Sequence, residues 1–203
     1  LDSVDVGESV TLSASETPNK SEQIPSTGFS WDTDSDGVND VNGVMTEQSW
    51  SEPGSYSVRL SVISSDSRSA STTRTITVSD MSPPSVTMSP SGQIAKGFGE
   101  EMSVTATFTD NWGIESIDWL FDGAIVLSNY SISEPSSTLS IQVSDDYSAG
   151  EHVTSIIVTD KSGLSTRQDV TVVFMDVSAP VISPYEAQIE VESGDPTILQ
   201  VFA

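Results

Sequence analysis

The stretch Tyr56-Ser-Val-Arg-Leu-Ser-Val62 decides the fold of this chain. Apolar side chains occupy every second position, and serine or arginine occupies the positions between them. Successive side chains of a β-strand point to opposite faces of a sheet, so this alternation predicts a strand with one face in a core and the other in water. Pro53-Gly54, just before the stretch, has the composition of a turn.

The same period of two recurs along the chain, and no stretch has a helical period. Ile117–Phe121, Leu139–Val143 and Val170–Phe174 repeat the pattern, with Gly-containing turns between the runs. Each half of the chain also carries a tryptophan on an early predicted strand, Trp31 and Trp119, which we expect to face a core. Short, regularly spaced strands of this kind predict an all-β fold of antiparallel β-sandwiches.

Composition excludes several classes of function. The 203 residues include 7 Lys and Arg against 30 Asp and Glu, a formal net charge of −23 at pH 7. So acidic a surface repels phosphate backbones, which excludes nucleic acid as a partner. With no cysteine and one histidine, the chain has no disulfide, no thiolate or His-pair metal site and no thiol nucleophile. No apolar run is long enough for membrane insertion within this segment.

Two sets of markers repeat along the chain. Gly7-Glu8, Gly99-Glu100 and Gly194-Asp195 each precede an alternating run. Asp80-Met-Ser-Pro-Pro84 is matched by Asp176-Val-Ser-Ala-Pro180. The markers are spaced by roughly ninety residues, close to the size of one β-sandwich domain of about 100 residues. The sequence therefore predicts tandem domains rather than a single core.

The proline-bearing segments are the predicted linkers, because proline cannot donate a hydrogen bond to a sheet. We therefore expect a β-sandwich over residues 1–80 with its first strand missing, a second over 81–177, and the first strands of a third over 178–203. Because these boundaries are out of phase with the ends of the chain, we expect the natural polypeptide to extend beyond both ends.

The first predicted domain resembles a known family. Trp31-Asp32 is followed by an Asp- and Gly-rich loop, then by Trp50 and by Pro53-Gly-Ser-Tyr-Ser-Val58. This order is similar to that of the PKD (polycystic kidney disease) domain, over residues 6–79. The resemblance implies tandem Ig-like (PKD-type) sandwiches, an extracellular or cell-surface setting and no catalysis of the domain's own.

The second predicted domain is similar to bacterial and archaeal Ig-like domains. The similarity is carried by Thr109-Asp-Asn-Trp-Gly-Ile114, Asp122-Gly123, Gly150-Glu-His152 and Thr159-Asp-Lys-Ser-Gly163. These turn segments occur in many sandwich families, so they are less specific than the PKD pattern. Each resemblance predicts a seven-stranded sandwich.

The sharpest chemical motif is Asp32-Thr-Asp-Ser-Asp-Gly-Val-Asn-Asp40. Carboxylates at alternate positions, a glycine that permits a sharp turn and a following carbonyl are oxygen ligands that suit Ca²⁺. The predicted metal ligands are Asp32, Asp34, Asp36, the carbonyl of Val38, and Asp40. Position twelve of the loop, where a bidentate acid is expected, is Gly43. The alternative is a solvated acidic turn.

Other candidate residues have simpler interpretations. His152 has no serine or acid neighbour in a catalytic pattern, so we expect a structural residue at a strand end. Asp110 and Asp160 lie near a predicted linker, where a cation between the domains is an alternative to plain solvated turns. Trp50 and Trp112 are the candidates for an exposed carbohydrate platform, with a core role expected for Trp50. No paired-acid cleft or nucleophile motif is visible, so we predict no catalytic residues and no enzyme activity.

These observations predict a non-catalytic extracellular structural or adhesive tandem array, such as a stalk, a surface-layer segment or a filament segment. Its expected partners are other copies of itself, neighbouring surface proteins or a polysaccharide, and Ca²⁺ is the expected cofactor. The alternative is an accessory module of a secreted hydrolase that holds a polysaccharide or protein substrate.

Overall fold

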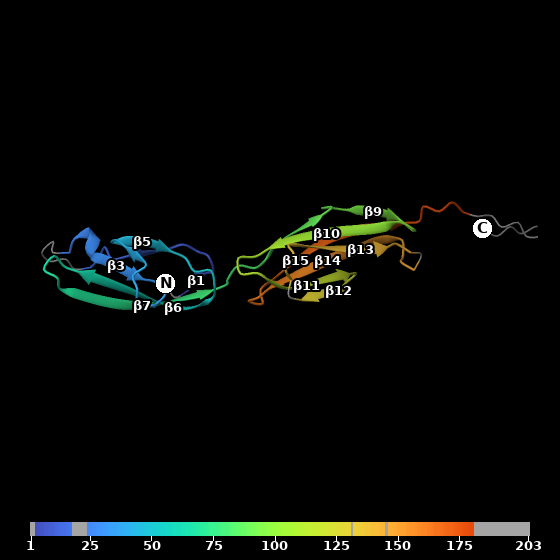
Figure 1. Ribbon diagram of the computed structural model, residues 1–203. Coiled ribbons are helices and arrows are strands. Elements are labelled where there is room, and N and C mark those ends of the chain that lie inside the picture. The colour runs from blue at the N-terminus through green and yellow to red at the C-terminus, as the bar shows by residue number, and fades with distance from the viewer. Residues whose placement is uncertain (1–2, 18–23, 131, 145, 181–203) are drawn as a thin grey trace, which may run out of the picture.

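The computed structural model describes residues 3–17, 24–130, 132–144 and 146–180. Two β-sandwiches lie end to end, joined by a short connection that leaves β7 and enters β8 (Figure 1). Within the described ranges the one helical element is a single 3₁₀ turn, η1 (Ser26–Gly28). The strands of a third domain, predicted over 178–203, lie outside the described residues from position 181 onward.

The first domain is built from a five-stranded and a two-stranded sheet. The larger sheet has the order β1-β7-β6-β3-β4, and the smaller one pairs β2 with β5. The strands are β1 (Val4–Asp5), β2 (Val10–Ser13), β3 (Phe29–Asp32), β4 (Val41–Asn42), β5 (Met45–Gln48), β6 (Gly54–Ile63) and β7 (Ser69–Ser79).

The second domain has a five-stranded sheet of order β12-β11-β14-β15-β9 and a three-stranded sheet of order β13-β10-β8. Its strands are β8 (Ser85–Ser89), β9 (Ile94–Gly97), β10 (Glu101–Thr109), β11 (Ile114–Phe121), β12 (Ala124–Tyr130), β13 (Ser136–Gln142), β14 (Gly150–Asp160) and β15 (Ser165–Met175). The all-β tandem sandwich is thus the fold of this chain.

The pairing is antiparallel with one exception in each domain. β1 pairs with β7 in parallel, and β9 pairs with β15 in parallel. In the second domain the exception arises because the chain changes sheets after β8: β8 pairs with β10 in the smaller sheet, and β9 then joins the larger one. The expectation of purely antiparallel sandwiches is therefore right for all other strand pairs described.

Period-two alternation builds both cores. In β10, Met102, Val104, Ala106 and Phe108 are all at most 2 % exposed, while the first and third residues of the strand are exposed. Burying an aliphatic or aromatic side chain of this size contributes about 1.5–3 kcal/mol, so this one strand face anchors the second domain.

The tryptophans predicted for the cores are buried in them. Trp119 is fully buried in the second core, and Trp31 and Trp50 are buried in the first. The indole N–H of Trp31 donates to the carbonyl of Gly43 at 2.9 Å, and that of Trp119 donates to the Ser137 hydroxyl at 3.0 Å. Each sandwich therefore has its own apolar centre, organised around indole rings.

Candidate functional site

The connection between the domains is held at one carboxylate. Asp5, at the end of β1, accepts hydrogen bonds from the Ser82 hydroxyl and from the Met81 amide, the latter at 2.9 Å. Asn111 of the second domain donates its amide to Asp5 at 3.2 Å and to the carbonyl of Val6 at 3.0 Å. The Ser82 hydroxyl is the main cause that lowers the pKa of Asp5. The linker and the second domain thus share one anchor in the first domain.

Trp112 adds an apolar contact at the same junction. It lies in the loop between β10 and β11 of the second domain, yet its half-buried ring packs against the core of the first domain. The alternative in which Trp112 forms an open carbohydrate platform is therefore not supported, because one part of the ring is already covered by the neighbouring sandwich. Sequence reasoning missed this role, since nothing in a turn sequence indicates which domain its side chain contacts.

Three aspartates from separate elements meet beside these contacts. Asp80 follows β7, Asp110 follows β10, and Asp160 ends β14. One carboxylate oxygen from each lies within 4.8 Å of the others. The cluster therefore joins the exit of the first domain to two loops of the second. Asp110 and Asp160 were candidates from the sequence, whereas Asp80 was not.

Each aspartate of this cluster uses its two oxygens differently. The Oδ1 atoms hold local turns: Asp80 accepts from the Ser82 amide at 3.3 Å, Asp110 accepts from two backbone amides, and Asp160 accepts from two amides and a hydroxyl. The Oδ2 atoms of all three are buried and have no hydrogen-bond partner in the described part of the chain. The turns thus account for the hydrogen bonds of the Oδ1 atoms, and they assign no role to the Oδ2 atoms.

Electrostatics at the cluster are unfavourable for bare carboxylates. Burial raises the pKa of Asp80, and the charges of Asp110 and Asp160 raise it further, against the opposing effects of the Ser82 amide and the nearby Ser162 hydroxyl. Like charges at this separation repel, and burial strengthens the repulsion by removing water. Among the described residues, no Lys, Arg or His nitrogen forms an ion pair with any of the three.

The end of β3 and the loop after it contain the calcium ligands predicted from the sequence. Asp32, Asp34 and Asp40 each place one carboxylate oxygen within 4.8 Å of the others. Asp36 lies outside this group, and its carboxylate accepts the Val38 amide at 2.7 Å. The Val38 side chain is exposed. The structure therefore brings together three of the four predicted aspartates.

Hydrogen bonds already occupy much of this loop. Asp32 accepts the Ser35 amide at 2.7 Å and the Gly37 amide at 3.2 Å, one on each oxygen. Asp40 accepts both the amide and the hydroxyl of Thr33, which lower the pKa of the Asp40 carboxyl. These hydrogen bonds stabilise the turn without a metal ion. At the junction, by contrast, the Oδ2 atom of each aspartate has no hydrogen-bond partner among the described residues.

His152 occupies a structural position, as expected. It is 7 % exposed and its ring stacks on Phe121 and lies 4.6 Å from the Phe174 ring, measured between centroids. Its Nδ1 lies 2.6 Å from Asp122 Oδ2 and its Nε2 lies 2.9 Å from the Ser148 carbonyl. Burial alone lowers the pKa of His152, but the two hydrogen bonds and the charge of Asp122 outweigh burial and raise it. Both ring nitrogens thus face acceptors, which favours the imidazolium.

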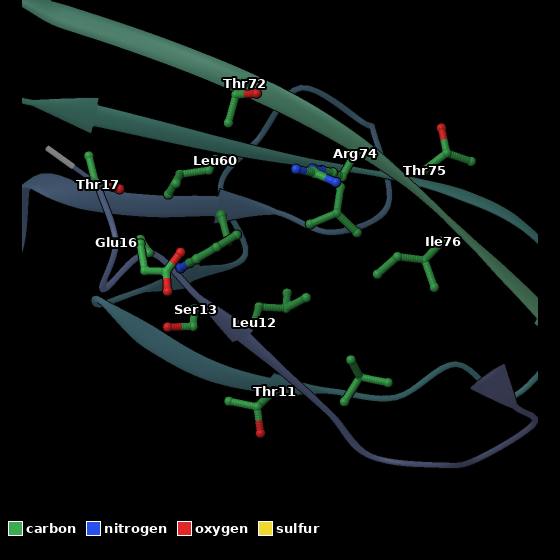
Figure 2. Close-up of a pocket in the computed structure, with 14 residues that line it drawn as sticks. Thr11, Leu12, Ser13, Glu16, Thr17, Leu60, Thr72, Arg74, Thr75 and Ile76 are labelled. Carbon is green, nitrogen blue, oxygen red and sulfur yellow. The ribbon is translucent and has the colours of Figure 1, made fainter. Parts of the chain in front are cut away.

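A groove of about 420 Å³ runs along the first domain between β2 and β7. Leu12, Arg74 and Ile76 face this space (Figure 2). In the second domain the corresponding edge is covered, because β10 pairs with both β13 and β8, whereas β2 pairs with β5 alone among the described strands. The groove therefore lies where the first domain has no described counterpart of β8.

Comparisons with known proteins add the following. No protein-family model matches the chain, and no curated protein sequence matches it. Among solved structures, the fibronectin(III)-like modules of Clostridium thermocellum CbhA are similar at 18% identity and a TM-score of 0.42, over 91% of this chain and 95% of that one. The titin domains Z1Z2 in complex with telethonin are similar at 16% identity and a TM-score of 0.45, over 86% and 92%.

The N-terminal eight Ig domains of Down Syndrome Cell Adhesion Molecule are similar at 15% identity and a TM-score of 0.40, over 90% of this chain and 26% of that one. Similarities this low carry no inference about ligand or partner, and they do not single out the PKD family. The PKD resemblance of residues 6–79 therefore stays a prediction. Separately, no helix in the described part of the chain has the length and apolar composition needed to cross a membrane.

Proposed function

We propose that this chain is a non-catalytic, extracellular structural or adhesive segment that holds other parts of an assembly apart. The observation that carries the proposal is the interlocked junction, in which Asn111 and Trp112 of the second domain contact the first domain directly. Domains joined only by a linker are free to move, whereas contacts of this kind fix one orientation. Two sandwiches fixed end to end make a spacer.

An extracellular setting fits the surface chemistry of the chain. It has no cysteine and carries a formal net charge of −23, with serine and threonine on many outward strand positions. Strong self-repulsion of this kind is relieved in salt-rich surroundings, because dissolved ions screen exposed charges. A cell-surface or secreted location is therefore part of the proposal.

An adhesive role is supported by the edge strand β12. Ile125, Val126 and Tyr130 are 62 %, 49 % and 72 % exposed. Exposed apolar side chains on an unpaired sheet edge are a common docking site for another chain. The proposed partners are other copies of this chain or neighbouring surface proteins. Replacing Tyr130 with Ser should weaken self-association measured by sedimentation at high concentration.

Calcium at the loop after β3 is a further part of the proposal. Asp32, Asp34 and Asp40 supply hard oxygen ligands, and the carbonyl of Val38 and the carboxylate of Asp36 complete the set expected from the sequence. The variant Asp34→Asn should lower calcium affinity without changing the fold, because Asp34 is exposed. Calcium titration of the intact chain by calorimetry measures this directly.

The alternative is an accessory module of a secreted hydrolase. The groove beside β2 is the observation that favours it, because a groove lined by apolar, hydroxyl and charged side chains can hold an extended polymer. Pull-down of the chain on chitin, cellulose and collagen tests this. Retention that is lost on changing Arg74 to Ala would favour the accessory module over the spacer.

Small-angle scattering tests the spacer itself. Strands of eleven residues give each domain a length of about 36 Å, so two in line make a rod with a radius of gyration of about 23 Å. A compact chain of this length has a radius of gyration of about 17 Å. A value near the compact figure would rule out the end-to-end arrangement.

A further inference from the structure

The junction cluster holds three buried carboxylate oxygens that have no hydrogen-bond partner among the described residues. The Oδ2 atoms of Asp80, Asp110 and Asp160 are buried without a partner, and Asp160 as a whole is only 1 % exposed. Buried polar atoms in native proteins are nearly always paired, and a buried charge is paired or coordinates a metal. We propose that Asp80, Asp110 and Asp160 bind a calcium ion that couples the two domains.

Among the described residues, no Lys, Arg or His nitrogen forms an ion pair with a carboxylate of this cluster. Ion pairs among the described residues involve other aspartates, and Lys161, the nearest cationic neighbour in sequence, extends its side chain over Gly113. Three carboxylates that each place one oxygen within 4.8 Å of the others therefore repel, and no ion pair among the described residues offsets the repulsion. A divalent cation reverses this situation by attracting all three at once.

The chemistry of the cluster fits calcium. Ca²⁺ takes about six to eight oxygen ligands in a flexible arrangement, whereas Mg²⁺ demands a near-ideal octahedron and usually keeps several waters. One carboxylate oxygen from each of the three aspartates lies within 4.8 Å of the others, so a single Ca²⁺ ion can contact all three residues. Calcium also needs further oxygens, and water can supply them through a shallow pocket of about 270 Å³ lined by Ser82, Pro83, Ser85, Thr109, Asp110 and Asn111.

An internal comparison shows that the turn does not itself require an aspartate. In the second domain the Asp160 amide donates to the Leu164 carbonyl at 3.0 Å, and the Asp160 carboxylate accepts the Leu164 amide. The β6–β7 turn of the first domain has the same pair of bonds, Ser64 with Arg68, and a serine hydroxyl serves as the acceptor. A serine is sufficient to hold this turn, so the second carboxylate oxygen of Asp160 is left for another use.

Asparagine variants of the intact chain separate a metal site from a structural cluster. Asn keeps the Oδ1 acceptor that holds each turn, and it replaces the charged oxygen with a neutral donor. The matched control is Asp176→Asn: the Asp176 carboxylate accepts the Ser178 amide in the equivalent linker turn, and it belongs to no described cluster. The background variant Asp34→Asn keeps the loop after β3 from contributing to the signal.

The difference in melting temperature between Asp160→Asn and the parent should change sign between EDTA and calcium. In EDTA, Asp160→Asn raises the melting temperature because it relieves repulsion. In calcium at 100 times Kd, the parent gains roughly 10 °C in the transition that separates the domains, and Asp160→Asn loses that gain. Asp176→Asn keeps the gain. If Asp160→Asn does not fold, Asp80→Asn, which is half-buried, undergoes the same comparison.

Two results overturn the site. Equal stabilisation of the asparagine variants in EDTA and in calcium would show a repulsive cluster without an ion. An equal shift of the parent with magnesium at the same concentration would overturn the assignment to calcium. The site stands on the junction geometry, so either result leaves the proposed spacer function to be judged by scattering.

Coupling is measured separately from binding. The chain has no cysteine, so Thr73→Cys in the first domain and Gln168→Cys in the second, both exposed, give a clean pair of spin labels. Calcium should narrow the distance distribution between the labels, and Asp160→Asn should abolish the narrowing. Binding without narrowing would overturn the coupling and retain the metal site.

Discussion

Removing the Asn111 side chain should uncouple the two domains by a calculable amount. Its amide donates to the Asp5 carboxylate at 3.2 Å and to the Val6 carbonyl at 3.0 Å. A hydrogen bond to a charged group contributes about 1.5–3 kcal/mol and one between neutral groups about 0.5–1.5 kcal/mol. The lower ends of these ranges sum to about 2 kcal/mol. Because Asn111 is exposed and Asp5 keeps its other donors, we take this sum as the upper limit and expect Asn111→Ala to cost about 1–2 kcal/mol.

This loss should fall on one unfolding event. The interface is destroyed when the less stable domain unfolds, so Asn111→Ala should lower the first transition in differential scanning calorimetry and leave the second in place. For a domain of this size, 1–2 kcal/mol corresponds to roughly 5–10 °C. The control is Asn129→Ala, an exposed asparagine on β12.

The reasoning fails if the two variants behave alike. It also fails if Asn111→Ala lowers both transitions, because that would place the effect inside the second domain rather than at the junction. A single cooperative transition in the parent, split in two by Asn111→Ala, would be the strongest form of the expected result.

Two further predictions concern the individual domains. Because the pKa of His152 is raised in the folded state, its contribution to stability is complete below pH 6.5, the ordinary value, and is lost as the pH rises through the folded-state pKa. The second domain should therefore have a lower melting temperature at pH 8 than at pH 6. Asp122→Asn, which removes the partner of His152, should make the melting temperature less dependent on pH. A Cβ on Gly28 would overlap the Ile63 carbonyl oxygen, so Gly28→Ala should cost the first domain about 1–3 kcal/mol in chemical denaturation. Gly54→Ala, whose Cβ would contact only the flexible Tyr56 ring at 3.4 Å, should cost less.

The cores were readable from the sequence because burial follows a local rule. Alternation within β10 and β14 places side chains by their position along one strand, and a tryptophan such as Trp119 is too large to be accommodated on the outer face at low cost. The strands follow from that rule, and the tandem arrangement follows from the markers that repeat along the sequence, such as Gly7-Glu8 and Gly99-Glu100. The parallel pairs could not be predicted from alternation, because the sheet that β1 or β9 joins depends on the fold around the strand.

The candidate sites divide in the same way. The loop of Asp32, Asp34 and Asp40 was found because its residues are neighbours in sequence, although Asp36 turned away to cap the Val38 amide. The positive φ angles of Ser35 and Gly37, 67° and 87°, redirect the chain on either side of Asp36. Asp80 could not be placed with its partners from the sequence, because docking of two domains brings them together.

The two parallel strand pairs determine how each sandwich would respond to being pulled from its ends. Tension along the polypeptide pulls β9 toward one terminus and β15 toward the other, so these parallel neighbours must slide past each other. Their hydrogen bonds are then loaded in shear and resist the force together. The second domain opposes sliding with four residue pairs between β9 and β15, and the first with two between β1 and β7. Under load, the first sandwich is therefore the one that should yield, lengthening the tether before the second gives way.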